Sequence, residues 1–130
     1  MTTSVVFYSG NLRTESQHLQ SGDRIITDAP IDNQGKGVAF SPTDLVATSL
    51  ANCMMTVMGI TANHHNIDIN GTRADVEKFM GVSPRRIVKI KIDFYFPLSY
   101  DTATKKLLET SALNCPVAKS LSESMSQKIN

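Results

Sequence analysis

The sequence has 130 residues, a size typical of one globular domain, so we expect residues 1–130 to form a single domain. Thirteen basic and twelve acidic residues leave a formal net charge of +1, and the two signs are interspersed along the chain. This balance argues against nucleic-acid partners and against binding to a membrane surface. No secretory signal follows Met1, so we expect a cytoplasmic protein whose two cysteines do not form a structural disulfide.

The first forty residues predict an antiparallel meander. Strand-like segments cover residues 4–8, 12–19 and 24–28, and Gly-containing turn signals separate them. A polar loop at residues 32–37 follows. This loop lacks the pattern of a phosphate-binding loop, so we expect it to be a simple connection.

A long helix is predicted from Pro42 to about His64. Ser41 can act as its N-cap, Pro42 suits the first helical position, and Asp44 lies where its charge favours the positive end of the helix. No charged residue occurs between Asp44 and His64. Because a helix without a charged face cannot lie on the surface of a soluble protein, we expect it to be buried on nearly all sides, with dimerisation supplying part of the cover.

Two other interpretations of this region are weaker. The run approaches the length of a membrane span, but Asn52 and Thr56 interrupt it and no basic cluster or aromatic belt flanks it, so we expect no membrane partner. His64 and His65 suggest a metal site, but adjacent helical positions point to different sides and no further ligand stands at suitable spacing. We expect neither a metal nor another cofactor.

The second half predicts two strands, two helices and a tail. The strands cover residues 67–78 and 87–96, the second with a clear alternation of apolar and polar residues, and they form an antiparallel hairpin. A helix begins at Thr102, and a short second helix follows Pro116. Residues 122–130 form a short edge strand or fray. The fold class predicted from these elements is α+β.

The two cysteines differ in their local surroundings. Cys115 precedes a helix N-terminus, where free N–H groups and the helix dipole would lower the pKa of its thiol. Cys53 lies deep in the apolar helix, where burial would raise the pKa, so a reactive thiolate there needs a nearby cation. Arg13 is the first candidate for that cation and Arg24 the second, because a guanidinium stays charged when partly buried.

If the two thiols face each other, they form a redox pair. One thiolate would attack the O–O bond of a peroxide and become a sulfenic acid, and the other would condense with it to a disulfide that an external thiol reduces. The plain alternative is that both cysteines are buried structural side chains, which is common for free cysteine.

Two motifs resemble the OsmC/Ohr family of osmotically induced and organic hydroperoxide resistance proteins. They are Ser-Pro-Thr-Asp-Leu at residues 41–45, ahead of Cys53, and Asn-Cys-Pro-Val-Ala-Lys-Ser-Leu at residues 114–121. The resemblance covers essentially the whole chain and is closest to the less-characterised branch with Ser-Pro-x-Asp/Glu-Leu. It implies an OsmC-like α+β fold in which antiparallel sheets wrap around long central helices in an intertwined homodimer.

The resemblance also implies a function. It implies thiol-dependent reduction of organic or fatty-acid hydroperoxides in oxidative-stress defence, with Cys53 as the peroxidatic thiol, Cys115 as the resolving thiol and an external dithiol as reductant. Characterised peroxidases of the family have a Glu ten residues before the first Cys, where it pairs with the catalytic Arg. This chain has Thr43 at that position, with the acid Asp44 one residue later. One residue turns a side chain by about 100° around a helix. The alternative is therefore a non-catalytic dimer that senses redox state or binds an apolar ligand.

Overall fold

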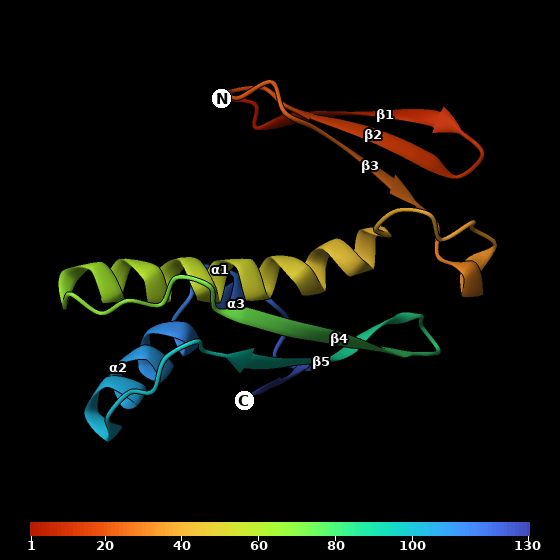
Figure 1. Ribbon diagram of the computed structural model, residues 1–130. Helices are drawn as coiled ribbons and strands as arrows, with labels where there is room; N and C mark the ends of the chain where they lie inside the picture. Colours follow the sequence, from red (N-terminus) through yellow and green to blue (C-terminus); the bar gives the residue numbers. More distant parts are fainter. The chain divides into compact units, whose positions relative to one another are not determined.

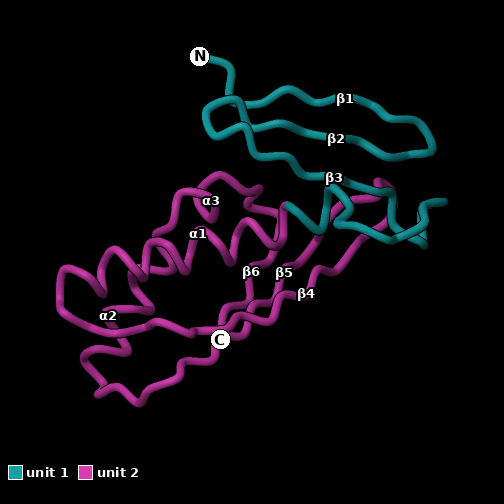
Figure 2. The backbone as a smooth tube through the Cα atoms, turned by 45° about the horizontal axis from the view of Figure 1, so that its top comes forward, with its two compact units in different colours: residues 1–45 teal, residues 46–130 magenta.

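The computed structural model describes residues 1–130 and has the α+β composition that the sequence predicts (Figure 1). Its elements are β1 (Ser4–Gly10), β2 (Arg13–His18), β3 (Arg24–Asp28), the short 3-10 helix η1 (Ile31–Asn33), α1 (Pro42–His64), β4 (Arg73–Gly81), β5 (Arg86–Tyr95), α2 (Thr102–Leu113), α3 (Pro116–Ser120) and β6 (Ser126–Ile129). The chain divides into two compact units, Met1–Leu45 and Val46–Asn130, which Figure 2 colours separately. Whether they act as one domain stays a prediction.

Unit 1 is the predicted meander, a three-stranded sheet in the order β1-β2-β3 with both pairs antiparallel. Residues that pair directly across strands share a face of the sheet. Arg13 pairs with Asp28, and Glu15 pairs with Ile26 on one side and Phe7 on the other, so all five lie on one face. After β3 the chain turns tightly.

Gly35 holds this turn close to the end of β3. A Cβ atom at position 35 would lie 1.7 Å from the carbonyl oxygen of Ala29, so only glycine fits there. The Gly35 amide also donates a hydrogen bond to the Pro30 carbonyl at 2.9 Å. The turn therefore fixes the backbone immediately after Asp28.

Helix α1 runs over the predicted residues and begins with the predicted cap. The Asp44 amide donates to Ser41 Oγ at 3.1 Å, and the Ser41 amide donates to Asp44 Oδ2 at 3.0 Å. This reciprocal pair is a capping box with Asp in place of the usual Glu or Gln. The helix start is thus specified locally by two side chains.

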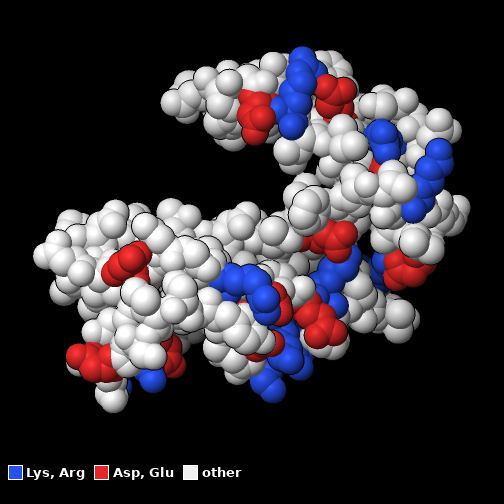
Figure 3. Space-filling view, in the orientation of Figure 1, with Lys and Arg blue, Asp and Glu red and all other residues white.

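The single chain buries one face of α1, and the expected cover of its other sides by a second copy stays a prediction. Its buried residues recur on one face and are Ala47, Leu50, Ala51, Met54, Met58 and Ala62. On other faces Val46 is 37% exposed and Ile60 is 55% exposed. The space-filling view shows the charged side chains gathered over other elements, while the length of α1 remains almost free of them (Figure 3). Residues of α1 outside its buried face therefore include large apolar side chains.

Helix α1 is also long and apolar enough to cross a membrane when judged by length and composition alone. Core helices of soluble proteins pass the same test. In this structure Leu50 and Met54 are fully buried against other elements, as expected for a core helix.

Unit 2 contains the second sheet, in the order β4-β5-β6. Strands β4 and β5 form the predicted antiparallel hairpin, and the tail forms the predicted short edge strand, β6. Strand β6 pairs with β5 in parallel, unlike the antiparallel sheets that the resemblance implies. The reason is the connection through α2 and α3, which returns the chain to the same end of the sheet. Strand β4 begins later than predicted because turns at residues 65–66 and 70–71 precede it, with positive φ at Asn66 and Gly71.

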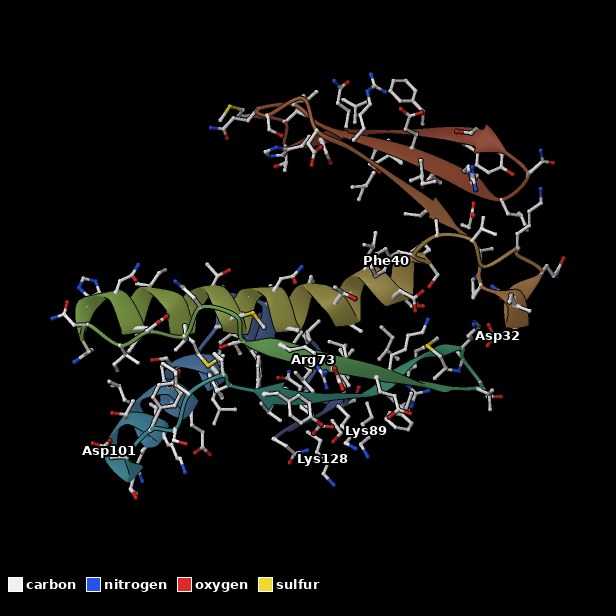
Figure 4. The ribbon with its side chains drawn as sticks, in the orientation of Figure 1. Asp32, Phe40, Arg73, Lys89, Asp101 and Lys128 are labelled. Carbon is white, nitrogen blue, oxygen red and sulfur yellow. The ribbon has the colours of Figure 1, made fainter.

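The core lies in unit 2 and joins α1, β5 and α2. Ile90 and Ile92 of β5 are fully buried, as the alternating pattern predicts. On other positions of this sheet, the Lys89 ammonium lies over the Phe79 ring and the Arg73 guanidinium over the Tyr95 ring, at 4.8 and 4.7 Å (Figure 4). The sheet therefore has an apolar face toward the helices and a charged face away from them.

Candidate active site

The structure brings Cys53 and Cys115 together in unit 2. Cys115 is the N-cap of α3, is fully buried, and accepts a hydrogen bond at Sγ from the Ala118 amide at 3.3 Å. Cys53 lies on α1, is partly buried and packs against the core cluster that includes Cys115. Both are free thiols, and Cys53 is close enough to Cys115 to perturb its ionisation. The arrangement is that of two neighbouring thiols, one of them partly accessible.

The prediction that the pKa of Cys115 is lowered is wrong. Burial raises the pKa of the Cys115 thiol and is the largest effect. Hydrogen bonds from the amides of Ala118 and Val117 act in the opposite direction, as the helix-terminus argument expects, and the neighbouring Cys53 adds a further upward contribution. Desolvation therefore outweighs the helix N-terminus. Cys115 is consequently the weaker candidate for the attacking thiolate.

In unit 1, Arg13 forms an ion pair that the sequence analysis did not predict. Its Nε donates to Asp28 Oδ1 at 2.7 Å and its Nη2 donates to Asp28 Oδ2 at 2.8 Å. The Arg13 hydrogen bond lowers the pKa of Asp28, and Asp28 raises the pKa of Arg13. The register of two adjacent strands, which pairs position 13 with position 28, would have revealed Asp28 as the partner.

The remaining predicted residues have other contacts. Arg24 pairs through Nη1 with Glu15 Oε1 at 2.5 Å, and both side chains are substantially exposed. Asp44 lies in the capping box, and Thr43 Oγ1 lies 3.2 Å from Ser41 Oγ. Arg24 pairs with Gln17 in the β2–β3 register, which places it on the same sheet face as Arg13. The two candidate arginines, Arg13 and Arg24, thus lie in unit 1, and the two thiols lie in unit 2.

Unit 2 also contains a cavity of about 470 Å³. Its wall is mostly apolar and aromatic and comes from α1, β5, the following loop, α2 and β6; it includes Met58, Phe94, Phe96, Leu98, Tyr100, Leu108, Leu113 and Ile129. Lys105 and Glu109 of α2 add charge. The Tyr100 ring meets the Phe96 ring edge-on, with centroids 5.6 Å apart. Helix α2 begins at its cap Asp101, which Figure 4 labels.

Residues 1–130 contain no group of three or more His, Cys, Asp or Glu placed to hold a metal ion.

Comparison with known proteins places this architecture in one family. The sequence profile of OsmC-like protein matches residues 34–130. A structure from Psychrobacter arcticus 273-4, of a candidate osmotic stress induced and detoxification response protein, has 55% identity over 99% of this chain and 94% of its own, with a TM-score of 0.97.

More distant structures share the fold. The organic hydroperoxide resistance protein OsmC from Legionella pneumophila has 16% identity over 99% of this chain and 96% of its own, with a TM-score of 0.76. An OsmC-like protein of unknown function from Vibrio cholerae has 13% identity over the full length of both chains, with a TM-score of 0.79. No curated protein sequence matches. The profile match and the 55% identity over nearly the whole chain show that this protein belongs to the OsmC/Ohr family.

Proposed function

We propose that this protein is a thiol-dependent peroxidase that reduces organic or fatty-acid hydroperoxides through Cys53 and Cys115. The observation that carries the proposal is the pairing of a partly exposed thiol on α1 with a fully buried thiol at the start of α3. The name of the Legionella protein, which shares the fold, refers to organic hydroperoxide resistance. The proposed role is defence against oxidative stress in the cytoplasm.

The proposed chemistry proceeds in three balanced steps. The Cys53 thiol, reacting as its thiolate, attacks one oxygen of the hydroperoxide; the O–O bond breaks, Cys53 becomes a sulfenic acid and the alcohol leaves with the proton. The Cys115 thiol then attacks the sulfenic sulfur, so a disulfide forms and water leaves. An external dithiol finally exchanges with this disulfide, restoring both thiols and becoming a disulfide itself.

The assignment of roles follows from burial. Cys53 is partly exposed and can meet a peroxide, whereas Cys115 is fully buried and burial raises the pKa of its thiol. A buried thiol of high pKa is a poor first nucleophile. It can still react with a sulfenic acid formed beside it, which makes Cys115 the resolving thiol in this proposal.

Arg13 is proposed to stabilise the Cys53 thiolate, with Arg24 as the second candidate. A guanidinium keeps its charge in a partly buried site and favours the ionised form of a nearby thiol. Arg24 is less suited because its pair with Glu15 is exposed to solvent. The Arg24→Ala variant is therefore expected to retain activity, whereas Arg13→Ala is expected to lose at least tenfold in kcat/KM.

We further propose that the working form is a homodimer. The face of the unit 1 sheet that carries Arg13 also carries Phe7 and Ile26, which are 57% and 44% exposed in the single chain. Helix α1 has its own exposed apolar residues, including Ile60. Large apolar side chains on two separate elements are the surface that a second copy would cover.

Hydroperoxide turnover by the purified protein tests the proposal. With cumene hydroperoxide and dithiothreitol, Cys53→Ser is expected to reduce turnover at least 100-fold. Cys115→Ser is expected to accumulate a Cys53 sulfenic acid that a dimedone probe traps. Unchanged turnover in Cys53→Ser would refute the assignment. Stoichiometric disulfide formation without turnover would instead favour the redox-sensing alternative.

The cavity of unit 2 supports a second candidate function, the binding of an apolar ligand. Its volume of about 470 Å³ lies in the range of small-molecule sites, and its wall is largely apolar. A fluorescent fatty acid is the direct probe. Leu98→Trp, at the exposed rim, is expected to weaken probe binding at least fivefold without altering Cys53 oxidation. Absence of binding to the wild-type protein would rule out this candidate for fatty acids.

A further inference from the structure

The family resemblance implies a carboxylate at position 43 that pairs with the arginine of the site, and this chain has none at that position. Position 43 is Thr, and the neighbouring Asp44 carboxylate accepts the Ser41 amide in the capping box. A different carboxylate, that of Asp28, binds Arg13 through both oxygens. We propose that Asp28 is the positioning residue for Arg13 in this protein, in place of a carboxylate at position 43. This inference rests on the proposed role of Arg13 in the peroxidase.

The geometry of the pair suits positioning. The two residues pair directly across β2 and β3, so their side chains lie on the same face of the sheet. Two parallel hydrogen bonds fix the plane of the guanidinium as well as its place. A guanidinium has five N–H donors, and the pair uses Nε–H and one donor of Nη2. The other three N–H donors, one on Nη2 and two on Nη1, are not used by this pair and could bind a thiolate or a peroxide oxygen.

Three contacts fix the backbone at Asp28 and Ala29. The Asp28 amide donates to the Phe40 carbonyl at 3.1 Å, and the Ala29 amide donates to the Leu12 carbonyl at 3.2 Å. The close approach of Gly35 to Ala29 fixes the turn that follows. Asp28 itself is only 4% exposed. A buried carboxylate on a fixed backbone can orient a partner more firmly than a mobile surface side chain.

The second ion pair of the same sheet provides the contrast. Arg24 and Glu15 have side chains 54% and 39% exposed, and a single ion-pair contact joins them. Exposed pairs of this kind contribute little and do not hold one geometry. Glu15→Gln is therefore the matched control for Asp28→Asn: both replace a carboxylate by an amide, beside an arginine, on the same face.

Electrostatics and positioning predict opposite results for Asp28→Asn. Removing the negative charge of Asp28 leaves Arg13 as a less compensated cation, which by charge alone would strengthen its attraction for a thiolate. Losing the two hydrogen bonds frees the guanidinium to leave its position. If Asp28 acts by positioning, activity falls although the local charge becomes more favourable.

The experiment measures two quantities in the full-length protein: kcat/KM for cumene hydroperoxide, and the pH dependence of Cys53 alkylation by iodoacetamide in a Cys115→Ser background. Asp28→Asn is expected to lower kcat/KM about tenfold and to move the alkylation midpoint to higher pH. Arg13→Ala should change both quantities at least as much as Asp28→Asn does. The double variant Arg13→Ala/Asp28→Asn should lose no more kcat/KM than Arg13→Ala alone. Asp28→Glu should recover part of the loss, and Glu15→Gln should match the wild type.

Arg13→Lys provides a second, independent variant at a partly exposed position. Lysine keeps the charge but cannot form the two-point contact. It is expected to resemble Asp28→Asn, and it decides the question if Asp28→Asn does not fold. The proposed role of Asp28 would be overturned if Arg13→Lys had the kcat/KM and alkylation midpoint of the wild type. It would also be overturned if Asp28→Asn had an unchanged or increased kcat/KM.

The two proposals fail in different ways. If the wild-type protein turns over hydroperoxide and loses this activity in Cys53→Ser and Arg13→Ala but not in Asp28→Asn, only the role of Asp28 is refuted. If the wild-type protein has no turnover, the peroxidase proposal is refuted, and the alkylation midpoints still decide whether Asp28 positions Arg13. If Arg13→Ala alters neither quantity, the role of Asp28 falls with that of Arg13.

Discussion

The two units of this chain bury different kinds of residue. All of the buried apolar residues lie in unit 2: Ala47, Leu50, Ala51, Met54, Met58, Ala62, Ile90, Ile92, Leu108, Ala112 and Cys115. The buried residues of unit 1 are polar, namely Thr27, Asp28 and Ser41, while most of its large apolar side chains are exposed. Unit 2 therefore has a core of its own, and unit 1 has a sheet without one.

This difference bears on the proposed chemistry. Cys53 and Cys115 lie in unit 2, which has its own core. The Arg13–Asp28 pair lies in unit 1, whose sheet has none. A three-stranded sheet without a packed face is only marginally stable alone. If a second copy covers this sheet, as proposed above, the proposed activity should depend on association.

The largest expected effect is on the core of unit 2. Leu50 is fully buried on α1, so Leu50→Ala should lower the free energy of unfolding by about 2–5 kcal/mol through lost burial and the cavity left behind. Denaturant unfolding followed by circular dichroism measures this. The exposed Ile60→Ala, on the same helix, is the control for the loss of a large side chain from α1. Both variants are measured at a protein concentration low enough that no dimer forms, because a second copy would cover Ile60. An equal loss there would contradict the difference between the buried and exposed faces of α1.

The next effect tests whether a second copy covers unit 1. Phe7→Ser should weaken association about tenfold or more, because it removes a large apolar side chain from the face that carries Arg13. Analytical ultracentrifugation over a dilution series measures the dissociation constant. Leu19→Ser, at the exposed end of the meander, serves as a control of similar exposure. A wild-type protein that is monomeric at every concentration would refute the homodimer.

The fold was largely predictable from the sequence because its elements have strong local signals. The cap at Ser41 and Asp44 and the absence of charge up to His64 predicted α1 to its observed ends. The alternation in β5 predicted both its position and its buried face. The parallel pairing of β6 was missed because it depends on where α2 and α3 return the chain, which no local pattern encodes.

The candidate site was only partly predictable. Cys53 and Cys115 are marked by motifs, and they prove to be neighbours. The sign of the pKa shift at Cys115 was missed because it is set by burial, which depends on the packed core and not on the helix start alone. Asp28 was missed as the partner of Arg13 because their pairing depends on the register between β2 and β3.

A smaller effect is expected at the helix cap where the units adjoin in sequence. Asp44→Ala removes one half of the capping box and should cost about 1 kcal/mol of stability. It should leave kcat/KM for hydroperoxide unchanged, because its carboxylate is used by the helix start. Asp44→Asn, which keeps an acceptor, should recover most of the stability. A tenfold loss of kcat/KM in a folded Asp44→Asn variant would show that Asp44, rather than Asp28, serves the site.

The Arg13–Asp28 pair should also appear in the pH dependence of stability. Its hydrogen bond lowers the pKa of Asp28 in the folded protein, so the pair's stabilisation is complete above the unfolded value of about 3.9 and is lost as pH falls through the folded value. Urea unfolding between pH 7 and pH 2 should therefore show an acid-dependent loss that Asp28→Asn diminishes. An identical acid dependence in the two proteins would mean that the pair does not persist in solution.

The smallest expected effect is that of Glu15→Gln. Because the Arg24–Glu15 pair is exposed on both sides, its loss should change the free energy of unfolding by no more than about 0.5 kcal/mol at pH 7. The variant should also keep the acid dependence contributed by Asp28, since that pair is intact. Two ion pairs on one sheet face would then differ only in burial and in the number of hydrogen bonds. A larger loss of unfolding free energy in Glu15→Gln than in Asp28→Asn would mean that the sheet face of unit 1 is buried at Arg24 rather than at Arg13. Arg24 would then be the better candidate partner for Cys53.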